Sequence, residues 1–405
     1  MRKTFTFIAC MSAIVATATA YAQPTSFSDG KVRIGVLNDA SGPYMDLAGP
    51  GSVIAARMAA EDFGGTVLGV PIEIVAGDHQ NKPDVGSAIA RRWFDEQEVD
   101  AITDVPTSSV ALAVQEIVRA KKKVFLISGA ATAALTGANC SPYSIQTSED
   151  TTALSVGTTK TVLKGGADTW FFLTADYAFG HAMEADSRRV VESSGGKVVG
   201  SVRHPQNTAD FSSFLLQAMA SKAKAIGLAN AGNDTVNSIR QAVEFGVTEG
   251  GQKLVGLILH ISDVHALGLE KAHGLQLTEG FYWDMNDESR AFSKRFFEHH
   301  KKMPTREQAT TYATVLHYLR SIEIAKTDDS DAVMRVMKSE PMKYFGEEAP
   351  IREDGRWMHG LRLYEVKKPS ESKYPWDYYR LVASIPAEDA YPPLSESQCP
   401  FIKKQ

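Results

Sequence analysis

The sequence predicts an α/β protein of two lobes, each a doubly wound parallel sheet covered by helices. Three observations support this fold class. Apolar runs alternate with stretches of helical periodicity along most of the chain. The alternation comes in two successive series of similar order. The 405 residues, 43% of them hydrophobic and 22% charged, exceed one typical globular domain and suit two.

A leader precedes the first series. Arg2 and Lys3 are followed by an apolar run over residues 5–15 and by the small-residue ending Ala-Tyr-Ala at 20–22. This order is typical of a secretory signal peptide, residues 1–22, with cleavage expected after Ala22. The run is too short to cross a bilayer, and no later window reaches the roughly 18 apolar residues that a membrane helix needs. We therefore expect the mature chain to be exported to the periplasm and soluble there.

Export also bears on the cysteines. Removal of the leader leaves Cys140 and Cys399, and an oxidising compartment favours their pairing. We predict a disulfide between them, which would tie down a C-terminal tail of residues 391–405. Two separate buried thiols are the alternative interpretation.

The first series begins near residue 31. It reads as strand 32–37, helix 51–63, strand 70–76, helix 83–97, strand 101–102, helix 108–120 and strand 124–127. Such strand–helix alternation is typical of a parallel sheet covered by helices.

The second series follows residue 147. It reads as helix 152–163, strand 169–173, helix 180–193, strand 197–202, helix 211–220, strand 225–229, helix 234–245 and strand 254–259. Later, a strand-like run covers 275–283, and helices are predicted over 287–300 and 306–326. Residues 355–357 and 361–366 are typical of a hairpin and surface strands.

In open parallel sheets, ligands bind outside the carboxyl ends of the strands, where helix N-termini present unpaired N–H groups. The turns at these places are rich in Ser, Thr, Asn, Asp and Gly. Candidate binding residues in them are Tyr44, Thr107, Ser108, Ser109, Ser128, Ala130, Ala131, Thr132, Tyr177, Phe179, Asn230, Asn233, His260 and Asp263. For any one hydroxyl or carboxyl among them, simple N-capping is the alternative explanation.

Several of these turns also carry a family resemblance. Ile-Gly-Val-Leu at 34–37 with Ser-Gly-Pro at 41–43, Asp78 with Pro83, Thr-Ser-Ser at 107–109 and Ile-Ser-Gly-Ala-Ala-Thr at 127–132 resemble the leucine/isoleucine/valine-type periplasmic binding proteins. Residues 176–180 look like that family's Tyr-x-x-Gly signature at the start of a second-lobe helix. The likeness in element order covers nearly the whole mature chain.

The resemblance implies a type I periplasmic binding protein fold, with two lobes joined by a three-strand hinge. The crossovers should fall near 147–150, 279–284 and 344–348. Lobe 1 would then comprise 31–147 plus 284–344, and lobe 2 would comprise 148–279 plus 345–390.

The resemblance also implies site roles. Thr107, Ser108, Ser109 and the turn residues Ala130, Ala131 and Thr132 would offer hydroxyl and backbone N–H donors to a ligand carboxylate. Amino-acid binders of the family place an acidic side chain in the second lobe, whereas the matching turn here contains His260 and Asp263. Aromatic residues near the cleft, Tyr44, Tyr177, Phe179 and Tyr282 with Trp283, suit a flat ligand body. The run 171–181 also resembles the subgroup that binds aromatic carboxylates such as benzoate or phenylpropenoate derivatives. For Trp283, a hinge or core role is equally compatible.

Catalytic motifs that an enzyme would need are absent from the sequence. It contains no Gly-x-Ser-x-Gly elbow, no phosphate-binding Gly-x-x-x-x-Gly-Lys-Ser/Thr loop and no His-Glu-x-x-His zinc motif. We expect no cofactor or metal. The net charge of -5 with scattered basic residues argues against nucleic acid as a partner.

We therefore expect a monomeric receptor that carries a small organic acid to the membrane permease of an ABC importer. A branched-chain amino acid or an amide is the alternative ligand. A sensory receptor of the same fold is the second functional hypothesis, and a secreted hydrolase is the third.

Overall fold

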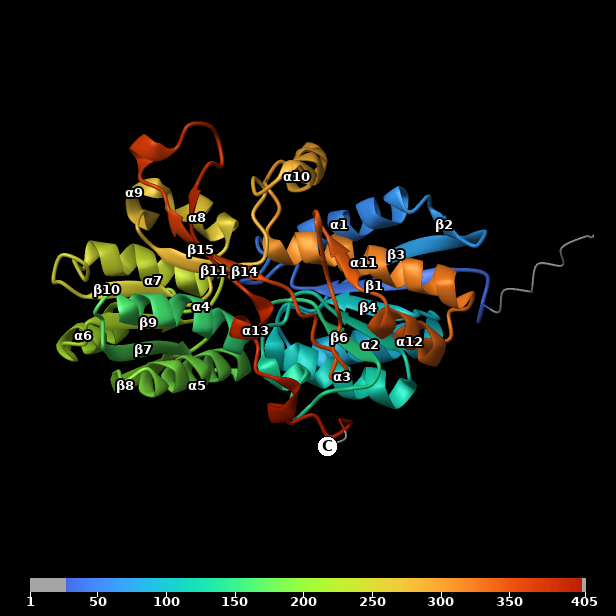
Figure 1. Cartoon of the computed structure of the whole chain (residues 1–405), viewed down its shortest axis with the longest axis horizontal. Helices are drawn as coiled ribbons and strands as arrows, with labels where there is room; N and C mark the ends of the chain where they lie inside the picture. The colour runs from blue at the N-terminus through green and yellow to red at the C-terminus, as the bar shows by residue number, and fades with distance from the viewer. Residues whose placement is uncertain (1–26, 403–405) are drawn as a thin grey trace, which may run out of the picture.

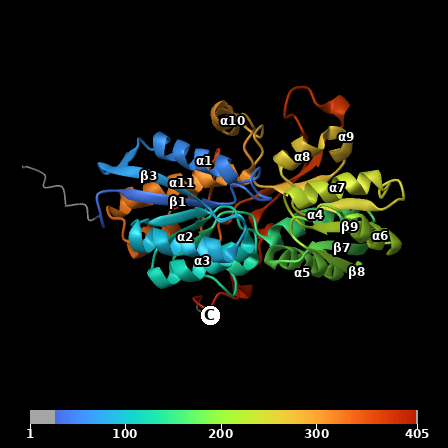
Figure 2. The same ribbon diagram turned by 180° about the vertical axis from the view of Figure 1, so that it is seen from behind.

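The computed structural model describes residues 27–402, so the expected signal peptide lies outside its described part. Two α/β bodies lie side by side, and the chain passes between them several times (Figure 1; Figure 2). No helix in the range 27–402 is long and apolar enough to span a membrane.

The first lobe is built on a six-stranded sheet of order β2-β3-β1-β4-β5-β6, parallel except for the short edge strand β2. Its strands are β1 (Val32–Asn38), β2 (Thr66–Val67), β3 (Val70–Asp78), β4 (Ala101–Asp104), β5 (Val124–Ile127) and β6 (Ser144–Gln146). Ile34 and Val36 face a core shared with α1 (Gly49–Asp62) and α11 (Arg306–Ala325). The opposite face packs against α2 (Pro83–Glu96) and α3 (Ser108–Lys121).

Two more helices of the late sequence return to this lobe. They are α10 (Asp287–His300) and α12 (Ser330–Ser339), and their Phe292, Phe296, Met334 and Met337 belong to the core on the α1 and α11 face.

The second lobe has a four-stranded parallel sheet of order β10-β9-β7-β8. Its strands are β7 (Thr169–Ala175), β8 (Lys197–His204), β9 (Ala225–Ala229) and β10 (Lys253–Gly256). One face packs against α4 (Thr151–Lys164) and α5 (Ala178–Ser193), and the other against α6 (Ser212–Ala220) and α7 (Asn233–Glu244). The short helices α8 (Ile261–Leu267) and α9 (Leu269–Ala272) follow β10. The strand predicted over 254–259 therefore ends three residues early.

A third, antiparallel sheet of order β11-β14-β15 adjoins the second lobe. It consists of β11 (Gln276–Glu279), β14 (Leu361–Val366) and β15 (Tyr379–Ile385), with η2 (Pro369–Glu371) in the connection between the last two. Tyr364 and Tyr379 belong to the same apolar cluster as the α6 and α7 face.

The third crossover lies further along the chain than the predicted 344–348. The hairpin of β12 (Met342–Tyr344) and β13 (Glu347–Ala349) packs with Trp357 into the first lobe's core. Leu361 already belongs to a cluster with Ala153 of α4 in the second lobe. The chain thus changes lobes between residues 357 and 361.

The surface position predicted for residues 355–357 is wrong. Arg356 and Trp357 are each only 1% exposed. The guanidinium of Arg356 lies 3.0 Å from Asp150 and donates to the carbonyl of Ser148 at 2.6 Å. Arg356 is buried because these partners from the first crossover pair its charge at the junction of the lobes.

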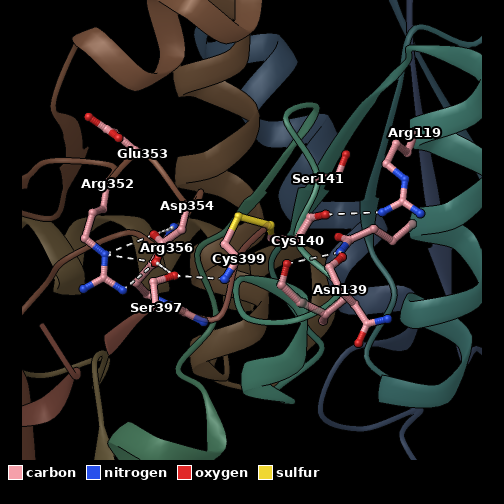
Figure 3. Close-up of a disulfide and its surroundings, with 12 residues drawn as sticks. Arg119, Asn139, Cys140, Ser141, Arg352, Glu353, Asp354, Arg356, Ser397 and Cys399 are labelled. Carbon is pink, nitrogen blue, oxygen red and sulfur yellow. Dashed lines mark hydrogen bonds and ion pairs between the residues drawn. A yellow bond between two sulfur atoms is a disulfide. The ribbon is translucent and has the colours of Figure 1, made fainter. Parts of the chain in front are cut away.

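The C-terminal tail returns from the second lobe to the first. After α13 (Ala387–Ala390), Tyr391 packs against Ala153 of α4, and the chain continues through η3 (Leu394–Glu396). The predicted disulfide between Cys140 and Cys399 is confirmed, and it joins the tail to the segment between η1 (Ala133–Leu135) and β6 (Figure 3). The tail is therefore a further link between the lobes.

Candidate functional site

The turns that follow the strands of both lobes meet at a small cavity between the lobes. Its volume is about 20 Å³, which is near the space of one water molecule. The lining residues are Tyr44, Leu47, Pro106, Gly129, Ala131 and Glu307 of the first lobe and Tyr177, Phe179, Ala231, Ile258 and His260 of the second. Because small-molecule sites usually measure roughly 300–1,000 Å³, a ligand can enter only when the lobes separate.

Two contacts hold the lobes together on one side of the cavity. The hydroxyls of Tyr44 and Tyr177 hydrogen-bond to each other. The backbone N–H of Asn233 donates to the carbonyl of Pro43 at 3.4 Å. Gly232 allows this approach, because its φ is 59° and a Cβ there would lie 2.5 Å from the Pro43 carbonyl oxygen.

Aromatic and aliphatic side chains form most of the cavity wall. Tyr44 and Leu47 of the first lobe belong to the same apolar cluster as Phe179 and Ile258 of the second. The rings of Tyr177 and Phe179 lie 5.9 Å apart with their planes tilted by 40°. Ring faces in such an arrangement suit a planar, apolar ligand body.

His260 and Glu307 form the polar end of the cavity. Nε2 of His260, which precedes α8, lies 2.7 Å from Oε1 of Glu307 at the start of α11. Against the effect of burial, the charge of Glu307 and the hydrogen bond to Asp263 raise the pKa of His260 to about 10. Burial also opposes ionisation of Glu307, but His260 and Arg306 lower its pKa. At neutral pH the pair is therefore an imidazolium and a carboxylate.

Arg306 connects this polar end to the crossovers. Its Nε lies 3.1 Å from Oε1 of Glu307 and 3.1 Å from Oε2 of Glu149, which belongs to the first crossover. Its Nη1 lies 3.7 Å from Oε2 of Glu279, where the second crossover begins. Burial raises the pKa of Glu279 to about 8, so this carboxyl is largely neutral at pH 7. The network links the cavity to two of the three hinge segments.

Asp104 lies directly behind the first-lobe wall of the cavity. Asp104 and Val105 have φ values of 76° and 54°, in the left-handed region that non-glycine residues seldom adopt. Neither carboxyl oxygen of Asp104 has a hydrogen-bond partner among residues 27–402, and burial raises its pKa to about 8. A Cβ on Gly129 would lie 2.7 Å from Oδ1 of Asp104, so glycine makes room for this carboxyl.

Three of the helices of eight or more residues that begin at the cavity have no side-chain N-cap in the described structure. They are α3, α5 and α7, whose N-cap residues are Thr107, Tyr177 and Gly232. Their terminal N–H groups and helix dipoles favour a negatively charged group nearby.

Five of the residues predicted from the sequence line the cavity. They are Tyr44, Ala131, Tyr177, Phe179 and His260. Asp263 does not line the cavity but contacts a residue that does, since its carboxylate accepts the backbone N–H of His260 at 2.9 Å. Asn233 is exposed and contributes its backbone N–H to the contact with Pro43.

The predicted hydroxyl donors are engaged inside the first lobe. Thr107 donates to Oδ1 of Asn81. Oγ of Ser108 accepts the backbone N–H of Thr132 at 3.3 Å. Ser128 shares a 2.8 Å hydrogen bond with Thr311 of α11, and Ser109 is half-buried on α3. Thr132 caps η1 by accepting from the N–H of Ala134, so capping explains it.

The remaining predicted residues also make their hydrogen bonds away from the cavity. The carbonyl of Ala130 accepts from Nε2 of Gln146 at 2.9 Å. Asn230 accepts from the hydroxyl of Thr235 at 2.9 Å within the second lobe. Tyr282 and Trp283 both donate to the carbonyl of Trp376, at 3.0 and 2.9 Å, and pack at the hinge.

Sequence reasoning missed six lining residues: Leu47, Pro106, Gly129, Ala231, Ile258 and Glu307. Pro106, Gly129 and Ala231 lie in turns that were singled out for their polar neighbours. Glu307 lies within the capping box of Thr305 and Gln308, a pattern that marks a helix start and gives no signal of a site.

A larger groove of about 490 Å³ lies where η1 and α5 meet the C-terminal tail. It is lined by polar and small side chains, and none of its lining residues is aromatic. Its charged Arg352 and Asp354 pair with each other at 2.7 Å. We therefore place the candidate site in the interlobe cavity and not in this groove.

Comparison with known proteins gives consistent matches over most of the chain. A family model described as periplasmic binding protein matches residues 31–373. The crystal structure of a periplasmic binding protein from Burkholderia mallei is 48% identical, covers 92% of this chain and 100% of that one, and superposes with a TM-score of 0.91.

Two further relatives agree. A branched chain amino acid ABC transporter periplasmic ligand-binding protein from Burkholderia xenovorans is 41% identical over 91% of this chain and 99% of that one, with a TM-score of 0.82. Leu/Ile/Val-binding protein homolog 6 of Brucella melitensis is 24% identical over 355 residues, which are 85% of this chain and 89% of the relative.

Proposed function

The chain belongs to the periplasmic binding protein family, the solute-binding components of ABC transporters, and from this premise we propose that its ligand is a small carboxylate with a flat aromatic body. It is a binding protein and not an enzyme. Benzoate and phenylpropenoate-type acids are the proposed ligand class, and the permease of an ABC importer is the proposed partner.

One observation carries the proposal. The N-termini of α3, α5 and α7, without side-chain caps in the described structure, converge from both lobes on a cavity walled by Tyr44, Tyr177 and Phe179. The helix ends supply neutral donors for a carboxylate, and the rings supply an apolar surface for the rest of the ligand. Neutral donors also hold an anion less firmly than charged ones do, which suits a ligand that must be released.

We further propose that hinge closure reports the loaded state to the permease. The ligand would dock on the first lobe while the lobes are apart, and contacts with Tyr177 and Phe179 would then favour closure. A ligand shifts such an equilibrium only by what it gains in the closed form, so residues of the second lobe should control closure.

A thermal-shift screen tests the ligand class. The panel comprises aromatic acids, branched-chain amino acids and short amides. A ligand present at about 100 times its Kd should raise the Tm by about 3 °C in a chain of this size. Failure of every aromatic acid at millimolar concentration, or chemical conversion of a bound compound, would refute the proposal.

Matched variants then test the site. Tyr177→Ala removes a ring from the cavity and should weaken binding about tenfold or more. Tyr378→Ala removes a partly buried phenol that bonds to His265 outside the cavity, and it should leave the affinity unchanged. Equal losses in both variants would mean that the ligand binds elsewhere.

A further inference from the structure

The second carboxylate oxygen of Glu307 has no partner in the described structure. Oε1 is shared by His260 at 2.7 Å and by Nε of Arg306 at 3.1 Å, whereas Oε2 is buried without a hydrogen bond among residues 27–402. The side chain is 3% exposed and lines the interlobe cavity.

An unpaired oxygen on a buried, ionised carboxylate is unfavourable, because its hydration is lost without replacement. His260 and Arg306 keep Glu307 ionised, so protonation does not relieve this loss at neutral pH. The cavity beside it has room for about one water molecule, which could donate to Oε2 while no ligand is bound.

A ligand that enters the cavity displaces such a water. Affinity is lost when an entering group does not reproduce the hydrogen bonds of an ordered water. A ligand that presents only carbon to Glu307 would bury the unpaired oxygen, and one with an acidic oxygen there would meet like charge. A ligand with an N–H or O–H group at this end meets neither difficulty.

Tyr44, Tyr177 and His260, which also line the cavity, already have hydrogen-bond partners. Tyr44 and Tyr177 bond to each other, and both ring nitrogens of His260 have carboxylate partners. Among the lining side chains, Glu307 is therefore the ionised one that has a carboxylate oxygen without a hydrogen-bond partner in the described structure.

We propose that the ligand carries a hydrogen-bond donor, a hydroxyl or an amino group, at the end that lies against the start of α11, and that Glu307 accepts it. This inference rests on the proposed function, since it concerns the same interlobe site. Glu307 is then a specificity residue supplied by the first lobe, opposite His260 of the second.

Matched ligand pairs measured by titration calorimetry test the inference. 3- and 4-hydroxybenzoate are compared with benzoate, and leucine is compared with 4-methylpentanoate, which lacks the amino group. We expect the donor-bearing member of at least one pair to bind at least tenfold more tightly. The pair that shows the preference also distinguishes a phenol from an ammonium.

Two variants test whether Glu307 causes the preference for the donor-bearing ligand. Glu307→Gln should reduce the affinity ratio within the pair at least fivefold. Glu149→Gln replaces a carboxyl of the same Arg306 network that does not line the cavity, so it should affect both members alike and leave the ratio unchanged. Should Glu307→Gln fail to fold, Glu307→Asp serves in its place, with the same reduced ratio expected.

Equal affinities within all three pairs in the wild-type protein would overturn the inference while leaving the proposed carboxylate ligand intact. A donor preference that persists in the Glu307 variant would overturn the role of Glu307. If none of these compounds binds, the proposed ligand class is wrong and this inference fails with it.

Discussion

Removal of the disulfide should destabilise the folded chain by a predictable amount. Cys140 and Cys399 are 259 residues apart in sequence, so their bond closes a very long loop in the unfolded chain. In the chain-entropy model, a closed loop of this length stabilises the folded state by about 5–6 kcal/mol at 25 °C. The double variant Cys140→Ser with Cys399→Ser should lose most of this amount.

The loss can be read as a change in melting temperature. The unfolding entropy of a chain of this size is about 0.8 kcal/mol/K, so the Tm should fall by about 7 °C. Differential scanning calorimetry without ligand, at one scan rate, measures it. Ser397→Ala, two residues before Cys399 on the tail, is the control and should shift the Tm by less than about 1 °C. A fall below about 2 °C in the double variant would refute the loop-entropy reasoning.

Three further predictions concern the cavity. Because the folded pKa of His260 is raised to about 10, its stabilising contribution is complete below the unfolded value of about 6.5 and is lost as the pH rises towards 10. Urea unfolding should therefore show a decline over this range that His260→Gln flattens, and an equal decline in both proteins would contradict the assignment. Gly232→Ala places a Cβ 2.5 Å from the Pro43 carbonyl and should enlarge the radius of gyration in solution scattering; Gly268→Ala, also at positive φ but with no atom near its Cβ, should not. Burial raises the pKa of Asp104 to about 8, so ionisation of this carboxyl opposes folding increasingly from about pH 4 to pH 8. Asp104→Asn should therefore stabilise the protein by roughly 1–3 kcal/mol at pH 8.5 and by less at pH 5. An equal effect of the variant at the two pH values would show that the carboxyl does not titrate in this range.

The sequence predicts the layered architecture well because strand–helix alternation depends on local patterns. The apolar run near Val32 and the helical spacing near Ser108 each indicate one element, and β1 and α3 form there. The late segments are harder, since the burial of Arg356 depends on Asp150, which is distant in sequence. A charged residue beside Trp357 has the same local pattern on a surface strand and at a buried junction.

The site is predictable only in part for a similar reason. Rings such as Tyr44 and Phe179 reach the cavity because large side chains at strand ends have few other places to pack. Small hydroxyls at the same turns can bond to neighbours, and Ser128 does so with Thr311 of a helix far away in sequence. Glu307 comes from that same helix, so only the tertiary fold brings it to the turn that contains His260.

The closed state of the cleft has a consequence for the rate at which the protein can be loaded. While Tyr44 and Tyr177 are in contact, the cavity has room for only about one water molecule, so a larger solute is captured only by molecules whose lobes are apart. If about 1% of molecules are open, the apparent affinity is about 100-fold weaker than the intrinsic one. Loosening this pair of phenols should therefore speed capture and shorten the residence time of the bound solute.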